Sequence, residues 1–172
     1  MSNPDTAPKQ TDRPARGRLT IHRATESDLL SIAAIEQQSF PTLWNEETYR
    51  KELTRDIALF LVAKLDDEVV GYALSWNSAK ELHVLKIAVC PPYRRMNIAT
   101  ALMLQSLILA RKSGCEYCLL EVRESNIAAQ KMYEKLGFKI LGVHKKYYTD
   151  TDEDGIVLYA RFSDKEQESE IA

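Results

Sequence analysis

The segment from Ile98 to Ala110 constrains the fold more than any other part of the sequence. Its only polar residues are Thr100, Gln105 and Ser106, so a helix formed here is apolar around almost its whole circumference. Such a helix is stable only when other elements of the domain cover it. The rest of the chain must therefore supply a sheet against which this helix lies buried.

Four segments that precede this helix have the character of strands. They are rich in β-branched and aromatic residues, and they are Leu19–Arg23, Ala58–Leu65, Val69–Trp76 and Leu82–Val89. Only Asp66-Asp67-Glu68 separates the second from the third, which predicts a hairpin. Between the first two strands, the cap-like run Thr25–Asp28 predicts the start of one helix and Asn45 the start of another.

The segments after the apolar helix complete the pattern. Gly114 and Gly137 are predicted to end the helices that they follow. The pattern predicts a strand at Tyr117–Val122, a helix at Asn126–Leu136 and two last strands at Lys139–Val143 and Ile156–Phe162. A polar and acidic connection, Tyr147–Gly155, is predicted between the last two strands. The resulting order, βααβββαβαββ, predicts the α/β class, with a mixed, mostly antiparallel sheet flanked by helices on both faces.

One domain accounts for most of the 172 residues. Residues 1–17 have too little apolar surface to offset the entropy of ordering, so a disordered N-terminal tail is predicted there. Residues 163–172 hold four acidic residues against one lysine and are predicted to form an acidic C-terminal tail. The folded domain is therefore expected to span residues 18–162.

The charge balance argues against a partner that binds through bulk electrostatics. The chain has 23 Lys and Arg residues against 25 Asp and Glu residues, a net charge of −2, so nucleic-acid binding is not expected. Its apolar runs are far shorter than the roughly 18 residues of a membrane span, and no membrane association is expected. Because the N-terminus also lacks the apolar core of a signal peptide, we expect a cytoplasmic location. We also expect a monomer.

The cysteines predict neither a disulfide framework nor a metal site. Cys90, Cys115 and Cys118 are an odd number. Cys115 and Cys118 form a CxxC motif, but the three histidines are scattered without the spacing of zinc ligands. Buried small side chains are the simpler interpretation, and no metal is expected.

A short basic loop connects the predicted strand that ends at Val89 to the apolar helix. Arg94 and Arg95 lie in this loop, close to the helix start. Unpaired N–H groups at the start of a helix, together with the positive end of its dipole, favour a bound phosphate or pyrophosphate. From these residues alone, a phosphate site and a solvated turn are equally good interpretations.

Three runs of residues around this loop resemble the GNAT acetyltransferases. They are Arg94-x-x-Asn97-x-Ala99 after His83–Val89, the LEVRESN run Leu120–Asn126, and the MYEKLGF run Met132–Phe138. The resemblance spans about Leu19–Arg161 and is closest to the RimI-type branch, which acetylates protein N-termini and has archaeal and eukaryotic members. It implies the GNAT acyl-CoA N-acyltransferase fold, with acetyl-CoA as the co-substrate.

The resemblance also implies where acetyl-CoA lies, namely in a V-shaped opening between the strand ending at Val89 and the strand Tyr117–Val122. The implied cofactor-binding residues are Ile87, Ala88, Val89, Arg94, Arg95, Met96, Asn97, Ile98, Ala99, Thr100 and Asn126. Asn97 departs from the family pattern, because the loop usually has glycine there. Asparagine is the next most tolerant residue of left-handed backbone, so we expect the loop to keep its shape.

Three residues are candidates for proton transfer. Glu121 matches the family's general base, and a carboxylate in an apolar strand is costly to bury unless it is used or paired. The alternative is a purely structural role, as an ion pair with Arg123 on the same face of the strand. Tyr133 matches the general acid, although its place on an apolar helical stripe, taken without the resemblance, favours a core aromatic. His83 matches a histidine of some archaeal relatives, and its alternative is an exposed strand-end histidine.

The acceptor is predicted to be an α-amino group. Such a group titrates near pH 7.7 to 8.0 and is partly neutral at physiological pH, unlike a lysine amine. By the resemblance, a groove for the first residues of a peptide or protein is lined by Phe40, Trp44, Tyr147 and Tyr148, and a ribosomal protein is one candidate partner. Core packing is the alternative for Phe40 and Trp44. The predicted function is N-terminal acetylation, with a small-amine acetyltransferase and a weakly active CoA-binding module as alternatives.

Overall fold

The computed structural model describes residues 17–162. The predicted acidic tail at 163–172, and all of the predicted N-terminal tail except Gly17, lie outside these residues. Seven strands form one sheet in the order β1-β2-β3-β4-β5-β7-β6, and every neighbouring pair is antiparallel except β4 and β5. The strands are β1 (Leu19–Arg23), β2 (Ala58–Leu65), β3 (Glu68–Ser78), β4 (Glu81–Val89), β5 (Tyr117–Arg123), β6 (Lys139–Tyr148) and β7 (Glu153–Arg161).

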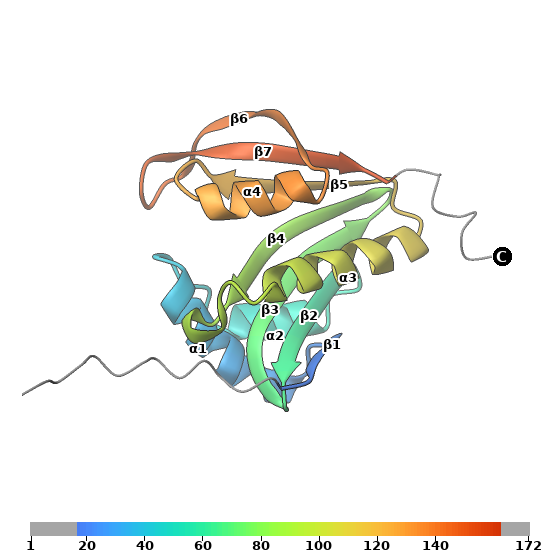
Figure 1. Ribbon diagram of the computed structural model, residues 1–172, viewed down its shortest axis with the longest axis vertical. Coiled ribbons are helices and arrows are strands. Elements are labelled where there is room, and N and C mark those ends of the chain that lie inside the picture. Colours follow the sequence, from blue (N-terminus) through green and yellow to red (C-terminus); the bar gives the residue numbers. More distant parts are fainter. Residues whose placement is uncertain (1–16, 163–172) are drawn as a thin grey trace, which may run out of the picture.

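Four α-helices flank the sheet on both faces, as the sequence predicts (Figure 1). They are α1 (Leu29–Ser39), α2 (Glu46–Leu53), α3 (Ile98–Lys112) and α4 (Ile127–Lys135), and two short 3-10 turns are η1 (Glu26–Asp28) and η2 (Pro91–Tyr93). Strand β2 shows how one sequence serves both faces. Its Leu59 and Leu61 pack in the core that holds α3 and α4, whereas Phe60 and Val62 pack in the core that holds α1 and α2. Within residues 17–162, no helix is long and apolar enough to cross a membrane.

Helix α3 is only half covered, which differs from the sequence-based expectation. Leu102 and Met103 have no exposed surface, but Leu104 and Ile108 on the other side of the helix are 45% and 47% exposed. The sheet can cover one face of a helix, and no other described element covers the opposite face of α3 to the same extent. The apolar residues beyond the core stripe therefore remain in contact with solvent.

The last two strands are longer than predicted. Strand β6 runs on to Tyr148 and β7 begins at Glu153, so most of the segment expected to be a connection belongs to the sheet. Strand β6 lies at the edge, is mostly exposed and pairs with β7 with irregular register near Gly142 and after His144. An exposed edge strand needs no regular apolar alternation, which is why the sequence pattern did not reveal the full length of β6.

The middle of the sheet divides into two diverging strands. Residues Glu81–Val84 of β4 pair with Tyr117–Leu120 of β5, and no pairing joins the later parts of these strands. On its other side, β4 keeps its pairing with β3 but has a bulge at Leu85, where the register shifts. A bulge bends a strand and increases its local twist. Strand β4 therefore leaves β5 and opens the sheet, as Figure 1 shows.

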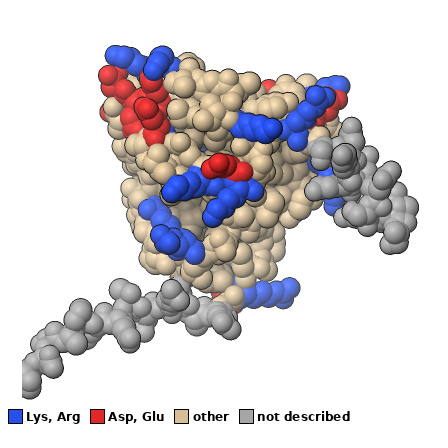
Figure 2. All heavy atoms as spheres, turned by 45° about the horizontal axis from the view of Figure 1, so that its top comes forward, with Lys and Arg blue, Asp and Glu red and all other residues tan. Residues whose placement is uncertain are grey.

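Charged side chains of both signs lie close together on the surface that carries β6 and β7. Figure 2 shows lysine and arginine beside aspartate and glutamate there, without one broad area of a single sign. The ion pairs of this region include Lys145 with Asp154 and Lys146 with Asp152. Pairs of this exposed kind contribute little to stability.

Candidate active site

A groove of about 1180 Å³ occupies the opening between β4 and β5. Its floor is formed by Val84–Val89 and Leu120–Arg123, and its walls by the start of α3, by α4 and by the segments that follow α1 and β6. This is the V-shaped opening that the resemblance predicts. Because no described strand pairs with β4 on this side after Val84, its backbone N–H and C=O groups there are available to a ligand that pairs like a strand.

The loop before α3 forms one end of the groove. Arg95 and Asn97 both have left-handed backbone, with φ of 64° and 60°, and α3 begins directly after Asn97. The conformation expected for Asn97 is therefore the one observed. The loop is anchored by Arg94, whose Nε donates to the carbonyl of Val89 over 3.0 Å. At this end, the first N–H groups of α3 have no partner within the helix and suit an anion.

Most of the predicted cofactor-binding residues line this groove. The exception is Met96, which is 40% exposed and is not among the lining residues. Asn126 lines the groove, and its Oδ1 also caps α4 by accepting from the N–H of Ala129 over 3.1 Å. Its side-chain oxygen is therefore committed to the helix, and only its NH₂ group can donate to a ligand.

Glu121 and His83 form a hydrogen-bonded pair on the two diverging strands. Nε2 of His83 lies 2.9 Å from Oε2 of Glu121. The hydrogen bond raises the pKa of His83 and lowers the pKa of Glu121 below its ordinary value, against the opposing effect of burial in both groups. Glu121 lines the groove, whereas His83 does not. Glu121 is therefore an ionised carboxylate in the groove. His83 lies outside the groove lining and stabilises the charge of Glu121 through the hydrogen bond.

Arg123 does not pair with Glu121, so the alternative interpretation of Glu121 as an ion-pair partner of Arg123 is wrong. Its guanidinium donates to both carboxylate oxygens of Asp150, over 2.9 and 2.7 Å, and lies 4.0 Å from the ring of Tyr148. Oδ2 of Asp150 also accepts from Thr42 over 3.0 Å. These contacts join the segment after α1 to the segment after β6 across the groove.

Tyr133 is a core aromatic that also reaches the groove. It is 3% exposed and its ring packs against Phe138 at a centroid distance of 5.5 Å. Burial raises the pKa of its hydroxyl, and the group is therefore protonated at neutral pH. The ring is packed as the core interpretation predicts, and because the residue also lines the groove, its role as general acid stays a prediction.

The four predicted acceptor-binding aromatics meet at the other end of the groove. Phe40, Trp44, Tyr147 and Tyr148 all line it, although the first pair and the second pair are about a hundred residues apart. The two tyrosine rings are perpendicular, with centroids 5.0 Å apart. The hydroxyl of Tyr148 donates to the backbone carbonyl of Glu121 over 3.1 Å. This end of the groove is thus an aromatic surface joined to the backbone of the residue that carries the ionised carboxylate.

The chain is similar to known proteins in sequence and in fold. Residues 29–138 match the sequence profile of the acetyltransferase (GNAT) family. The chain belongs to the GNAT acetyltransferase family. It is 36% identical over 154 residues to an N-alpha-acetyltransferase of Sulfurisphaera tokodaii, covering 81% of this chain and 91% of that protein. It is 30% identical over 141 residues to the ribosomal protein bS18 alanine N-acetyltransferase of Escherichia coli, covering 81% and 95%.

Solved structures agree with the sequence relatives. The crystal structure of the Escherichia coli ribosomal-protein alanine N-acetyltransferase superposes with a TM-score of 0.78 at 30% identity, over 85% of this chain and 95% of that one. Ard1 from Thermoplasma volcanium superposes with a TM-score of 0.79 at 26% identity, over 85% and 99%. The predicted GNAT fold is confirmed.

GNAT enzymes use acetyl-CoA, and the groove has the charge and backbone that this molecule requires. The loop before α3 and helix α4 contribute four cations to its lining: Arg94, Arg95, Lys131 and Lys135. The two carboxylates of the lining, Glu121 and Asp150, come from β5 and the segment after β6. Sequence analysis missed Lys131 and Lys135, because lysines spaced four apart on a helix are usually a solvated face.

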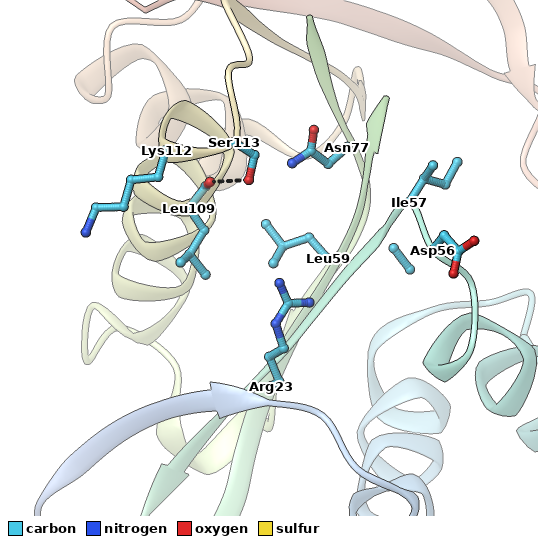
Figure 3. A pocket seen from close by; sticks show the side chains of 9 residues that line it. Arg23, Asp56, Ile57, Leu59, Asn77, Leu109, Lys112 and Ser113 are labelled. Carbon is cyan, nitrogen blue, oxygen red and sulfur yellow. Dashed lines mark hydrogen bonds between the residues drawn. The ribbon is translucent and has the colours of Figure 1, made fainter. Parts of the chain in front are cut away.

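A second cavity of this GNAT protein, about 330 Å³, lies at the other end of the sheet. Figure 3 shows Arg23 reaching into it from the end of β1, while the Lys112 side chain points away. Among residues 17–162 there is also no group of three or more His, Cys, Asp and Glu side chains placed to hold a metal ion. Of the three candidates for proton transfer, Glu121 and Tyr133 line the larger groove.

Proposed function

We propose that this chain, an acetyl-CoA-dependent N-terminal acetyltransferase of the RimI type, transfers an acetyl group directly to the α-amino group of a protein, with Glu121 as general base. The observation that carries the proposal is the ionised carboxylate of Glu121 in the groove. One end of this groove has free helix N–H groups and cationic side chains, and the other end has an aromatic surface. No covalent bond to the enzyme is required.

The cofactor end would hold acetyl-CoA through its backbone and its cations. The unpaired edge of Ile87–Val89 would pair with the amides of the pantetheine arm, and the N–H groups of residues 95–100 would hold the pyrophosphate. Asn126 would donate from its NH₂ group. The bound molecule supplies an acetyl thioester, and the four cations of the loop before α3 and of α4 would balance the negative charges of its phosphates.

Two residues would move protons. Oε1 or Oε2 of Glu121 would receive the proton of the acceptor amine, directly or through a water molecule. The hydroxyl of Tyr133 would protonate the leaving thiolate. Burial raises the pKa of Tyr133 further above that of a thiol, so this proton transfer is uphill and depends on how closely the hydroxyl is held to the sulfur. His83 would act through its hydrogen bond to Glu121.

The acceptor would be the N-terminus of a protein or peptide. Phe40, Trp44, Tyr147 and Tyr148 would contact its first residues, and a ribosomal protein is the proposed partner because the Escherichia coli relative is named for one. We further infer a monomer in the cytoplasm, where the free state of all three cysteines is the expected one.

An acetyl-transfer assay on peptides that differ in their first two residues tests the proposal. We expect acetylation at the α-amine, located by mass spectrometry, with a strong preference for some first residues. A panel of polyamines and other small amines is the control, and turnover of these amines in place of peptides would favour the small-amine alternative. Acetyl-CoA binding by calorimetry without any thiol release would favour a binding module.

A further inference from the structure

A buried polar network lies beneath the aromatic end of the groove. Its centre is Glu36 on α1, which is 1% exposed. Oε2 of Glu36 accepts from Tyr49 over 2.6 Å and also from Tyr72, and Oε1 accepts from the backbone N–H of Trp44 over 3.0 Å and from Nζ of Lys86. These contacts join α1, the segment before α2, α2 itself, β3 and β4.

Glu36 remains charged despite its burial. Burial alone raises the pKa of a carboxyl, but the bonds from Lys86, from the N–H of Trp44 and from the two tyrosines together hold the pKa of Glu36 below its ordinary value. A buried carboxylate is tolerated when its lone pairs are satisfied, and each oxygen here has two donors. The network is therefore complete.

Lys86 is the charged member of this network that reaches the groove. It follows the bulge of β4 and lines the groove, although its side chain is only 10% exposed. Its Nζ lies 4.3 Å from the ring centroid of Phe40 and 4.8 Å from that of Trp44. One ammonium group thus faces two aromatic rings and one buried carboxylate, an arrangement that restricts the rotation of both rings.

We propose that Lys86 is a positioning residue for the acceptor. Its ion pair with Glu36 and its contacts with the rings of Phe40 and Trp44, called the aromatic wall below, hold these two rings in the geometry that binds the acceptor. This inference rests on the proposed function, because it assumes that the wall contacts the acceptor. Lys86 does not exchange protons with the substrate. Its effect is on the shape of the acceptor end and not on the cofactor end, which is built from other residues.

The sharpest test compares Lys86→Met with Lys64→Met. Lys64 also pairs with a buried carboxylate, since its Nζ lies 2.8 Å from Oδ1 of Asp28, which is 3% exposed, but it does not line the groove. Both substitutions leave a buried carboxylate without its cation and lower stability. Only the first removes a contact to the aromatic wall.

We expect Lys86→Met to raise the KM for the preferred peptide about tenfold while kcat and the Kd for acetyl-CoA change less than about twofold. Lys86→Arg, which keeps the cation over the rings, should restore most of this loss. Lys64→Met should leave the peptide KM unchanged. Equal effects of Lys86→Met and Lys64→Met on KM, or a parallel loss of acetyl-CoA affinity, would overturn the inference.

A double variant separates positioning from stability. Glu36→Gln with Lys86→Met removes the buried unpaired charge, so the protein should regain thermal stability relative to Lys86→Met alone. If Lys86 positions the wall, the raised KM persists in this double variant. A return of KM to the parent value together with stability would show that the effect was only structural, and would contradict the proposal.

A fluorescence measurement tests the inference without any acceptor. The chain has two tryptophans, so Trp76→Phe leaves Trp44 as the single reporter. In this background, Lys86→Met should increase acrylamide quenching of Trp44 by about twofold, because the ring loses its fixed contact. An unchanged quenching constant would overturn the positioning role. If no peptide is acetylated but quenching increases, the proposed acceptor fails and the role of Lys86 in the wall stands.

Discussion

The two ends of the groove are built in different ways. The cofactor end depends on backbone geometry within one short stretch, where Arg95 and Asn97 adopt left-handed conformations just before α3. The acceptor end depends on side chains from distant parts of the chain, such as Thr42 and Asp150, which are 108 residues apart and share a hydrogen bond of 3.0 Å. A site of the first kind is sensitive to backbone strain, and a site of the second kind to the loss of single side-chain contacts.

The largest effect should come from the residue that lies between the two ends. We expect Glu121→Gln to lower kcat about 100-fold, because the neutral amide cannot take the amine proton, and to leave the Kd for acetyl-CoA unchanged. The loss should be greatest at low pH, where more of the amine is protonated. Steady-state kinetics from pH 6 to 9 measure this. Glu116→Gln, on an exposed residue that pairs with Lys80, is the control, and equal rates in both variants would exclude Glu121 as the base.

Backbone strain should affect the cofactor end next. Asn97→Val places a β-branched residue at a φ of 60°, which costs roughly 1–2 kcal/mol, and we expect acetyl-CoA binding to weaken about tenfold. Asn97→Gly removes the strain and should strengthen binding. Calorimetry measures both.

The chain offers a matched control for this strain. Ala79 also has left-handed backbone, with a φ of 53°, in the turn between β3 and β4, and it does not line the groove. Ala79→Val should lower stability without changing the Kd for acetyl-CoA. If Asn97→Val behaves like Ala79→Val, the loop does not hold the cofactor.

A smaller effect is expected from the contacts that join the two sides of the acceptor end. Asp150→Ala removes the partner of both Thr42 and Arg123, and we expect the peptide KM to rise about three- to fivefold with an unchanged Kd for acetyl-CoA. Lys145→Ala, which breaks an exposed ion pair on β6, should change neither constant. An altered acetyl-CoA affinity in Asp150→Ala would mean that the two ends are not independent.

The smallest effect should be a pH dependence of stability. The Glu121–His83 ion pair stabilises the fold fully between the ordinary pKa of the carboxyl, 4.5, and that of the imidazole, 6.5. This contribution is lost as pH rises through the raised pKa of His83 and as pH falls through the lowered pKa of Glu121. His83→Gln should therefore cost up to about 1 kcal/mol at pH 6 and less at pH 9.

Urea unfolding at the two pH values measures this difference. Glu81, whose Oε1 lies 4.0 Å from Nδ1 of His83, also faces the imidazole, and His144 acts on Glu121 through its charge. A Glu81→Gln background removes the first of these contributions. A loss of stability in His83→Gln that is equal at pH 6 and pH 9 would show that the bond does not depend on a charged histidine.

The sequence revealed local features well and distant contacts poorly. The hairpin at Asp66-Asp67, the cap at Asn45 and the stops at Gly114 and Gly137 all depend on neighbouring residues, and all are present. The end of β6 and the start of β7 were placed wrongly, because β6 is an exposed edge strand with little apolar periodicity and the added residues of β7 are mostly polar. The alternative ion pair of Glu121 with Arg123 is absent, and its hydrogen bond to His83 was not predicted, because His83 lies on a neighbouring strand 38 residues away in the sequence.

Lys86 shows what only the tertiary structure could decide. A lysine between Leu85 and Ile87 in an apolar strand was visible in the sequence, but its partner Glu36 is 50 residues away on a helix. The sequence by itself determined the elements, their order and the family, because short-range patterns and motifs encode them. The tertiary structure decided which charges meet and which edge of β4 stays open, because these depend on contacts between segments that the sequence keeps apart.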